Sequence, residues 1–194
     1  MPKRRDVEEQ RARLSAAVWS VLARDGLSGL TLRAVAARAG CTTGLVLHAF
    51  RDKRALLRHA RELLHERTGR RADAAQEAAG EPLDALRAVA LQALSLTAEG
   101  REEARVWVGF LAAAVSDEEL RELHVQHDRA FVQRVEQLLA AARPDLPRAA
   151  RTHHAVGLVA LVEGFNTLAA ADPQTYSPHR QRAAVDRLVD SLRA

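Results

Sequence analysis

A short segment around Gly40 has the residue types and spacing of a site that reads nucleic acid. In the 20-residue window 32–51, two short helical stretches are separated by Gly40, where a left-handed backbone is expected. Two helices that cross closely need a small residue at the crossing point, and Ala36 falls there. The window therefore predicts a helix-turn-helix whose second helix presents its N-terminal half to a major groove.

The helical register also predicts which side chains of this window are exposed. Inward positions fall to Val35, Ala39, Cys41, Val46 and Ala49. The remaining face holds Thr42, Thr43, Gly44, Leu45, Leu47 and His48. Threonine hydroxyls and free backbone amides suit phosphate oxygens, leucine suits a thymine methyl group, and histidine can donate to a phosphate or a base. Glycine lets the backbone approach closely. We interpret this face as one that selects bases.

Residues beside the window complete the predicted DNA-contacting set. Thr31 is placed to cap the first short helix, and Arg33 follows it. Lys53 comes directly after a second capping residue, Asp52, and is one of two lysines against 27 arginines. We expect Thr31, Arg33 and Lys53 to position the protein on the phosphate backbone. Three more arginines are placed to neutralise phosphates: Arg38, Arg51 and Arg54. The alternative is that these charges form an ordinary solvated face.

The charge of the chain is unevenly distributed. The 194 residues carry a formal net charge of +4, but residues 1–71 hold 16 basic and 7 acidic side chains, a net +9. Residues 72–194 hold 13 basic and 18 acidic side chains, a net −5. Such a division indicates double-stranded DNA or another polyanion as the partner of the first part only.

Other protein classes are disfavoured by the composition. The single cysteine, Cys41, allows no internal disulfide and no cysteine-based zinc finger. The apolar stretch 106–115 has ten residues, whereas a membrane span needs about 20. No apolar segment of a signal peptide follows the basic N-terminus. We therefore expect a cytoplasmic protein without a membrane partner.

The hydrophobic pattern predicts an all-α chain of about nine helices, because no stretch alternates with period two. After a basic arm, apolar positions begin at Leu14 and Gly26 ends the pattern. A helix follows Asp52, and we read Thr68–Gly80 as its solvated end and a linker. Further helices are expected at 83–98, 102–115, 118–143, 148–171 and 179–193. The predicted organisation is a helix-turn-helix domain at 1–52, a connecting helix and linker at 53–80, and a helical bundle at 81–194.

Aromatic and polar side chains in the second part could line a pocket for a small molecule. The candidates are Trp107, Phe110, Leu111, His127, Phe131, Phe165 and Asn166. Large aromatic residues in a chain with so few of them are equally suited to filling a core. The identity of a ligand cannot be read from these residues.

An enzyme is the less favoured class. His124, His127 and Asp128 lie close in sequence, and His153 and His154 could approach them, as in a metal-dependent hydrolase. The spacing is not that of a His-Glu-x-x-His helix, and no phosphate loop, dinucleotide-binding turn or serine elbow is present in the sequence. We expect no catalytic residues, no metal and no cofactor.

The segment Leu14–Leu57 resembles the N-terminal domain of the tetracycline-repressor (TetR) family of transcriptional regulators. The resemblance is carried by the string DGLSGLTLRAVAARAGCTTGLVLHAFRDKRALL, with its Gly-x-x-x-x-Thr, Ala-x-x-Ala-Gly and Phe-x-x-Lys-x-x-Leu motifs in register. Two strings further on, REEARVWVGFLAAAVSDEELRELH and VEGFNTLAAADPQTYSPHRQ, are similar to the C-terminal domain of BetI-type members. Many members have tyrosine where this chain has Leu47 and lysine where it has Thr43. This chain therefore lacks one hydrogen bond to a phosphate and one positive charge that those members have.

The resemblance implies a homodimer that binds a palindromic operator, most simply as a repressor released by a small-molecule effector. It also implies that the last two long helices of each copy form a four-helix interface. The segment 155–168, apolar nearly all round, agrees with a helix buried on two sides. The predicted interface residues are Val156, Val159, Glu163, Val185, Leu188, Val189 and Leu192. A regulator that activates or that needs no ligand is the alternative.

Overall fold

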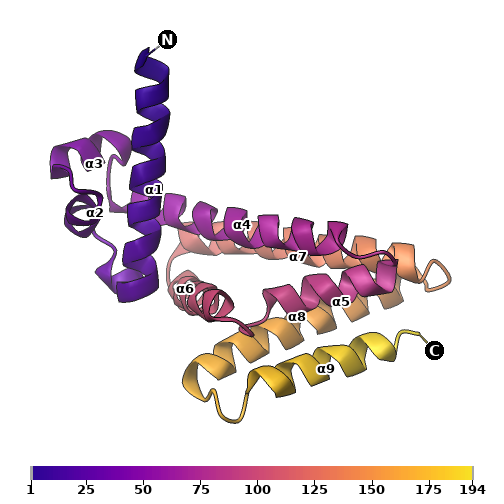
Figure 1. Ribbon diagram of the computed structural model, residues 1–194. Helices are drawn as coiled ribbons and strands as arrows, with labels where there is room; N and C mark the ends of the chain where they lie inside the picture. The colour runs from indigo at the N-terminus through magenta and orange to yellow at the C-terminus, as the bar shows by residue number, and fades with distance from the viewer. Residues whose placement is uncertain (1, 194) are drawn as a thin grey trace.

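The computed structural model describes residues 2–193, with side chains from Val7 onward, and within that range every regular element is an α-helix. The predicted all-α class is confirmed. Figure 1 shows α1, α2 and α3 grouped at one end and the remaining helices packed as an elongated bundle. The helices are α1 (Pro2–Gly29), α2 (Leu32–Ala39), α3 (Thr43–Ala49), α4 (Lys53–Glu77), α5 (Pro82–Ala93), α6 (Ala98–Ala114), α7 (Glu118–Ala142), α8 (Arg148–Ala171) and α9 (Pro178–Asp190).

Local capping chemistry fixes the helix-turn-helix. The Thr31 hydroxyl accepts a hydrogen bond from the Ala34 amide at 3.1 Å and starts α2. Gly40 ends α2 in the left-handed region, with φ of 62°. Asp52 caps α4 by accepting a hydrogen bond from the Ala55 amide at 2.8 Å. These boundaries agree with the predictions from sequence.

The helix α1 begins well before the first apolar position of the pattern, Leu14. Its backbone is helical from Pro2, so it includes the segment described from sequence only as a basic arm. Residues 7–13 are mostly glutamate, glutamine, arginine and alanine, which favour helix without any apolar stripe. The side chains of the basic residues Lys3, Arg4 and Arg5 lie outside the described set. Gly26 interrupts the helix as expected, with φ of 66°.

The buried side chains form two cores, and α4 and α7 contribute residues to both. The first core holds apolar residues of α1 to α3, the first half of α4 and the second half of α6, including Val106 and Phe110. The second core is formed mainly by α5, α7, α8 and α9. α4 therefore belongs to both, since Leu56 lies in the first core and Ala72 in the second. This long helix joins the two parts of the chain (Figure 1).

Two boundaries along this path differ in part from those expected. Most of Thr68–Gly80 is the expected helix end, because α4 continues to Glu77, and Ala72 on it is buried. The helix expected at 102–115 begins earlier, at Ala98. Thr97 caps α6 by accepting from the Gly100 amide at 3.0 Å, so Gly100 lies in the first turn. A Cβ at Gly100 would lie 2.8 Å from the Leu94 carbonyl oxygen, so close approach of the backbone requires glycine there.

α8 is unusually apolar for a helix with so much free surface. By length and composition alone it is the one helix of residues 2–193 that could cross a membrane, with a mean hydropathy of 1.3. Only 28% of that apolar window is buried inside the single chain. The helix thus leaves an apolar surface that its own bundle does not cover.

Candidate functional site

The face of α3 predicted to read bases is largely exposed. Thr42, Thr43, Gly44 and His48 are open to solvent, and Leu47 is 45% exposed, which is unusual for a large apolar side chain. We call these five residues the reading face. Leu45 is half-buried and packs against the first core, so it is not a fully presented member of this face. Ala49 is exposed rather than inward, because α3 ends there.

The same residues set the position of α3. The Thr42 hydroxyl accepts from the Leu45 amide at 3.3 Å, so its oxygen is used to start the helix while its O–H is free to donate. A Cβ built at Gly44 would meet only the Thr42 hydroxyl oxygen, at 3.9 Å, among the described residues. The chain's own packing therefore does not demand glycine at this position, and the backbone there is bare on the exposed face of α3.

The basic residues near α3 fall into two groups. Arg33 and Lys53 are exposed, as expected for phosphate contacts. Other arginines turn toward the protein: Arg38 donates to the Ser20 hydroxyl at 2.7 Å, and Arg54 donates to Glu119 of α7 at 3.0 Å. Positive charge in this part of the chain is thus shared between the outer surface and contacts with the bundle.

A cavity of about 490 Å³ lies between α4, α6, α7 and α8. Four of the predicted pocket residues line it: Trp107, His127, Phe131 and Asn166. The other three do not. Phe110 is buried in the first core, Leu111 is half-buried away from the cavity wall, and Phe165 packs against the second core with its ring edge-on to Tyr176. For Phe110 and Phe165 the simpler interpretation as core residues agrees with the structure, and Leu111 belongs to neither core.

The charged residues of the cavity were not identified from sequence. Arg61 of α4 faces Asp128 of α7 and Glu163 of α8, which act on its charge. Burial lowers the pKa of Arg61 to about 10, and the two carboxyl groups oppose that change. Burial, followed by the charge of Asp128 and a hydrogen bond with it, raises the pKa of Glu163 to about 7. One signal was available: Arg61 lies three residues before Leu64 and so on the apolar stripe of its helix.

Two histidine rings stack in the cavity wall. The rings of His65 and His127 lie 4.0 Å apart between centroids, at 29°. Burial, followed by the charge of Arg61, lowers the pKa of His127 to about 4, so this ring is neutral at neutral pH. Across residues 2–193, no group of three or more His, Cys, Asp or Glu side chains is arranged to hold a metal ion.

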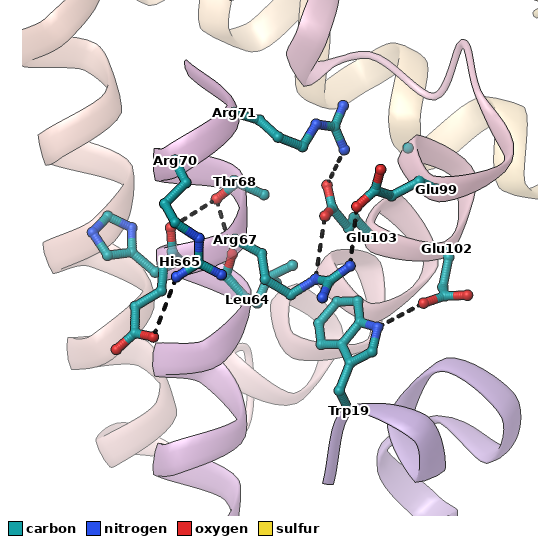
Figure 2. Close-up of polar contacts among 12 residues, drawn as sticks. Trp19, Leu64, His65, Arg67, Thr68, Arg70, Arg71, Glu99, Glu102 and Glu103 are labelled. Atoms are coloured by element: carbon teal, nitrogen blue, oxygen red, sulfur yellow. Dashed lines mark hydrogen bonds and ion pairs between the residues drawn. The ribbon is translucent and has the colours of Figure 1, made fainter. Parts of the chain in front are cut away.

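A polar junction connects the cavity wall with α1, and Figure 2 shows it. Glu103, which lines the cavity from α6, pairs with Arg71 and Arg67 of α4. The Arg67 guanidinium lies over the Trp19 ring, 4.2 Å from its centroid. The Trp19 indole N–H donates to Glu102 of α6 at 2.7 Å. We call these residues, with Glu99, the junction; they join the cavity to α1, the first helix of the helix-turn-helix domain.

The residues predicted for a dimer interface are mostly placed elsewhere. Val159, Val185, Val189 and Leu192 are buried in the second core, so their side chains have no surface to offer a second copy. Glu163 lines the cavity and Leu188 packs against the second core. Val156 alone is strongly exposed, at 51%. The uncovered apolar side of α8 instead includes Val156, Gly157, Ala160 and Leu168.

The fold and the reading face together define a helix-turn-helix protein with a helical second part that encloses a cavity. Comparison with known families agrees. Residues 14–67 match the model for bacterial regulatory proteins of the tetR family, and residues 82–194 match the model for the C-terminal domain of BetI-type transcriptional repressors. The chain belongs to the TetR family and is a helix-turn-helix transcriptional regulator.

Individual relatives span nearly the whole chain. The HTH-type transcriptional regulator BetI of Paraburkholderia xenovorans (strain LB400) is 36% identical over 170 residues, which cover 85% of this chain and 84% of that protein. The crystal structure of a transcriptional regulator from Rhodococcus sp. Rha1 has a TM-score of 0.82 at 28% identity, over 93% of this chain and 94% of that one. A putative transcriptional regulator from Saccharomonospora viridis, solved in complex with choline, has a TM-score of 0.84 at 17% identity, over 94% and 96% of the two chains.

Proposed function

We propose that this regulator is a ligand-responsive repressor that binds a palindromic DNA operator as a homodimer. The observation that carries the proposal is the reading face of α3. Its uncharged side chains and bare Gly44 backbone are exposed, while Arg33 and Lys53 flank it. Charged flanks suit sequence-independent phosphate contacts, and an uncharged face suits selection among bases.

Selection of binding sites from a random pool of DNA duplexes tests the proposal. We expect palindromes with half-sites about 10 bp apart, or a multiple of that, and an affinity that falls steeply with salt. If no palindrome is preferred over random duplex, the proposal is wrong.

Three substitutions separate phosphate contacts from base contacts. Lys53→Ala should weaken binding to all sequences alike and reduce the salt slope by about 1. Thr43→Ala and His48→Ala should change which bases are preferred. Arg129→Ala, at an exposed site on α7, is the matched control and should change neither property. Identical effects of the first three would contradict this division of roles.

Dimerisation through α8 is supported by the surface that the single chain leaves open. Val156 and Leu168 are 51% and 45% exposed on a helix of mean hydropathy 1.3. Gly157 and Gly164 have no described atom within 4 Å of a built Cβ, so a second helix could approach closely there. A second copy suits this face because two identical helix-turn-helix units read the two halves of a palindrome.

The cavity is our candidate effector site, and the junction is the route by which occupancy changes DNA binding. A ligand that displaces α4 or α6 would move Glu103 and Arg67, and with them Trp19 of α1. The distance between two recognition helices would then cease to match the operator. A coupling of about 1–3 kcal/mol is sufficient for a strong effect on occupancy. The choline complex of the Saccharomonospora viridis protein supports a small-molecule effector for this fold.

The relatives are named as regulators, which supports a DNA-binding protein rather than an enzyme. A regulator of this kind would work in the bacterial cytoplasm, where its DNA lies. Release from the operator by a cavity ligand is the result that this proposal predicts. A ligand that binds the cavity and leaves operator affinity unchanged would favour a ligand-independent regulator instead. Transcription that rises when the protein is bound would favour an activator.

A further inference from the structure

The charges on the cavity wall are mostly matched with one another. Eight aspartate, glutamate and arginine side chains line the cavity, and five of them form ion pairs: Glu66 with Arg70, Asp73 with Arg134, and Glu103 with Arg71 behind the wall. Three remain without an ion pair among the residues described: Arg61, Asp128 and Glu163. They come from α4, α7 and α8 and so meet across the cavity.

Arg61 lacks the partners that a buried guanidinium requires. Its side chain is only 4% exposed, yet within residues 7–193 it makes no hydrogen bond, and its Nε is enclosed without any acceptor. A buried charge without hydrogen bonds is expensive for the folded state. A ligand oxygen, above all a carboxylate that can accept two hydrogen bonds in parallel, would satisfy it.

Asp128 and Glu163 form an acid pair on the other side. Burial, followed by the charge of Asp128 and its action as a hydrogen-bond partner, raises the pKa of Glu163 to about 7. The pair carries one negative charge once Glu163 is protonated, which occurs below that pKa. With Arg61, the unpaired part of the wall is then neutral overall and strongly dipolar.

Two further features favour a ligand with both an apolar body and an N–H donor. Asn166 donates its amide N–H to the Ala93 carbonyl at 2.9 Å, and its own carbonyl oxygen is buried without a donor among the described residues. Trp107 and Phe131 supply apolar surface beside the polar groups. The volume of about 490 Å³ suits a compact organic molecule.

We propose that the cavity takes a small zwitterion, with a carboxylate that binds Arg61, an ammonium group that binds Asp128 and Glu163, and an apolar body against Trp107 and Phe131. The inference rests on the proposed function of the cavity as the effector site and names the chemical class of its ligand. A zwitterion keeps the wall and its contents neutral. A simple amine would balance only if the acid pair lost its proton, and a simple carboxylate would leave a net negative charge in the cavity.

Three molecules of nearly equal shape test the charge requirement. L-phenylalanine is the zwitterion, 2-phenylethylamine lacks its carboxylate and 3-phenylpropanoate lacks its ammonium group. Leucine, 3-methylbutylamine and 4-methylpentanoate repeat the comparison with an aliphatic body. By calorimetry on the full-length protein at pH 7, at least one zwitterion should bind about tenfold or more tightly than both of its partners. If an amine or an acid alone binds as well as its zwitterion, or if neither zwitterion binds, the inference is wrong.

Substitutions locate the two contacts. Arg61→Gln should weaken zwitterion binding about thirtyfold or more without weakening amine binding. Asp128→Asn should weaken zwitterion binding without weakening acid binding, whereas Glu163→Gln, which mimics the protonated side chain, should leave both nearly unchanged. Arg58→Gln, on the exposed side of the same helix, should leave all three constants unchanged. If Arg61→Gln does not fold, the isosteric Asp128→Asn and the three-way comparison decide. Operator binding measured on the same samples separates the two proposals, since it depends on α3 and not on the cavity charge.

Discussion

Replacing Glu163 by glutamine should make the protein relatively more stable as pH rises, because the buried Glu163 has a raised pKa in the folded state. Burial beside Asp128 raises the pKa of Glu163 from 4.5 to about 7. Between these values the folded chain holds a proton that the unfolded chain has lost, so the free energy of unfolding falls as pH rises through this window. Each pKa unit corresponds to about 1.4 kcal/mol, which gives about 3 kcal/mol in all. Because water reaches this half-buried side chain, we take about half of that, ~1.5 kcal/mol.

Glutamine cannot ionise, so the free energy of unfolding of the variant lacks the fall with rising pH that Glu163 causes. The free energy of unfolding of Glu163→Gln, minus that of the wild type, should rise by about 1.5 kcal/mol between pH 4.5 and pH 8. Urea denaturation at fixed protein concentration measures it, since a dimer's stability depends on concentration. Glu122→Gln, at an exposed position on α7, is the matched control and should show a flat difference. A difference that is flat for Glu163→Gln as well, or that falls with pH, would refute the buried acid pair.

The remaining predictions concern the neighbouring histidine, the α8 surface and one glycine. Burial lowers the pKa of His127 from 6.5 to about 4, so the free energy of unfolding of the wild type falls as pH drops from 6.5 to 4. His127→Gln should reduce this fall by about 1–2 kcal/mol, measured in the same urea denaturation series. Val156→Glu should shift the dimer toward monomer in sedimentation, whereas Val7→Glu, at another exposed valine, should not; equal effects would argue against α8. Gly100→Ala should lower stability by about 1–3 kcal/mol on thermal unfolding. Gly69→Ala, inside α4 with no described atom within 4 Å of its Cβ, should raise it by about 0.5–1 kcal/mol.

The helix-turn-helix was predictable because its determinants are local. Thr31, Gly40 and Asp52 act on backbone groups within three or four residues, so their roles can be read without knowing the rest of the fold. The polar beginning of α1 was not identified as helix from sequence. A polar helix end has no apolar stripe, and only backbone propensity marks it.

The cavity was only partly predictable because sequence pattern distinguishes apolar from polar, and not core from cavity wall. Trp107 and Phe110 are three residues apart on one helix, yet one lines the cavity and the other fills the first core. The decisive side chains, Arg61, Asp128 and Glu163, come from three helices and acquire their chemistry only on meeting. The spacing of these three residues along the chain does not predict that they lie close together in the fold.

The helices predicted to form the dimer interface show what helical periodicity leaves undetermined. An apolar stretch such as 155–168 indicates burial on more than one side, but not which side faces the chain's own bundle. Val159 and Val156 are three residues apart, and the structure buries the first and exposes the second. A small rotation of the helix would exchange them, so the identity of interface residues depends on packing against α7 and α9.

The basic residues of segment 1–71, which has a net charge of +9, divide into two groups: some are exposed and others form ion pairs within the chain. Much of this charge lies on α4, whose arginines pair with acidic residues of α6 and α7: Arg54 and Arg58 with Glu119, Arg67 with Glu99 and Glu103, and Arg71 with Glu103. These pairs cross between the two parts of the chain, so the acidic second part acts as a partner of the basic first part. Charge that holds α4 in place is unavailable to phosphates, and Arg33 and Lys53 remain exposed beside the reading face. Under the proposed mechanism the same ion pairs would connect the cavity to the helix-turn-helix domain, because a ligand that disturbs α4 or α6 would act on them.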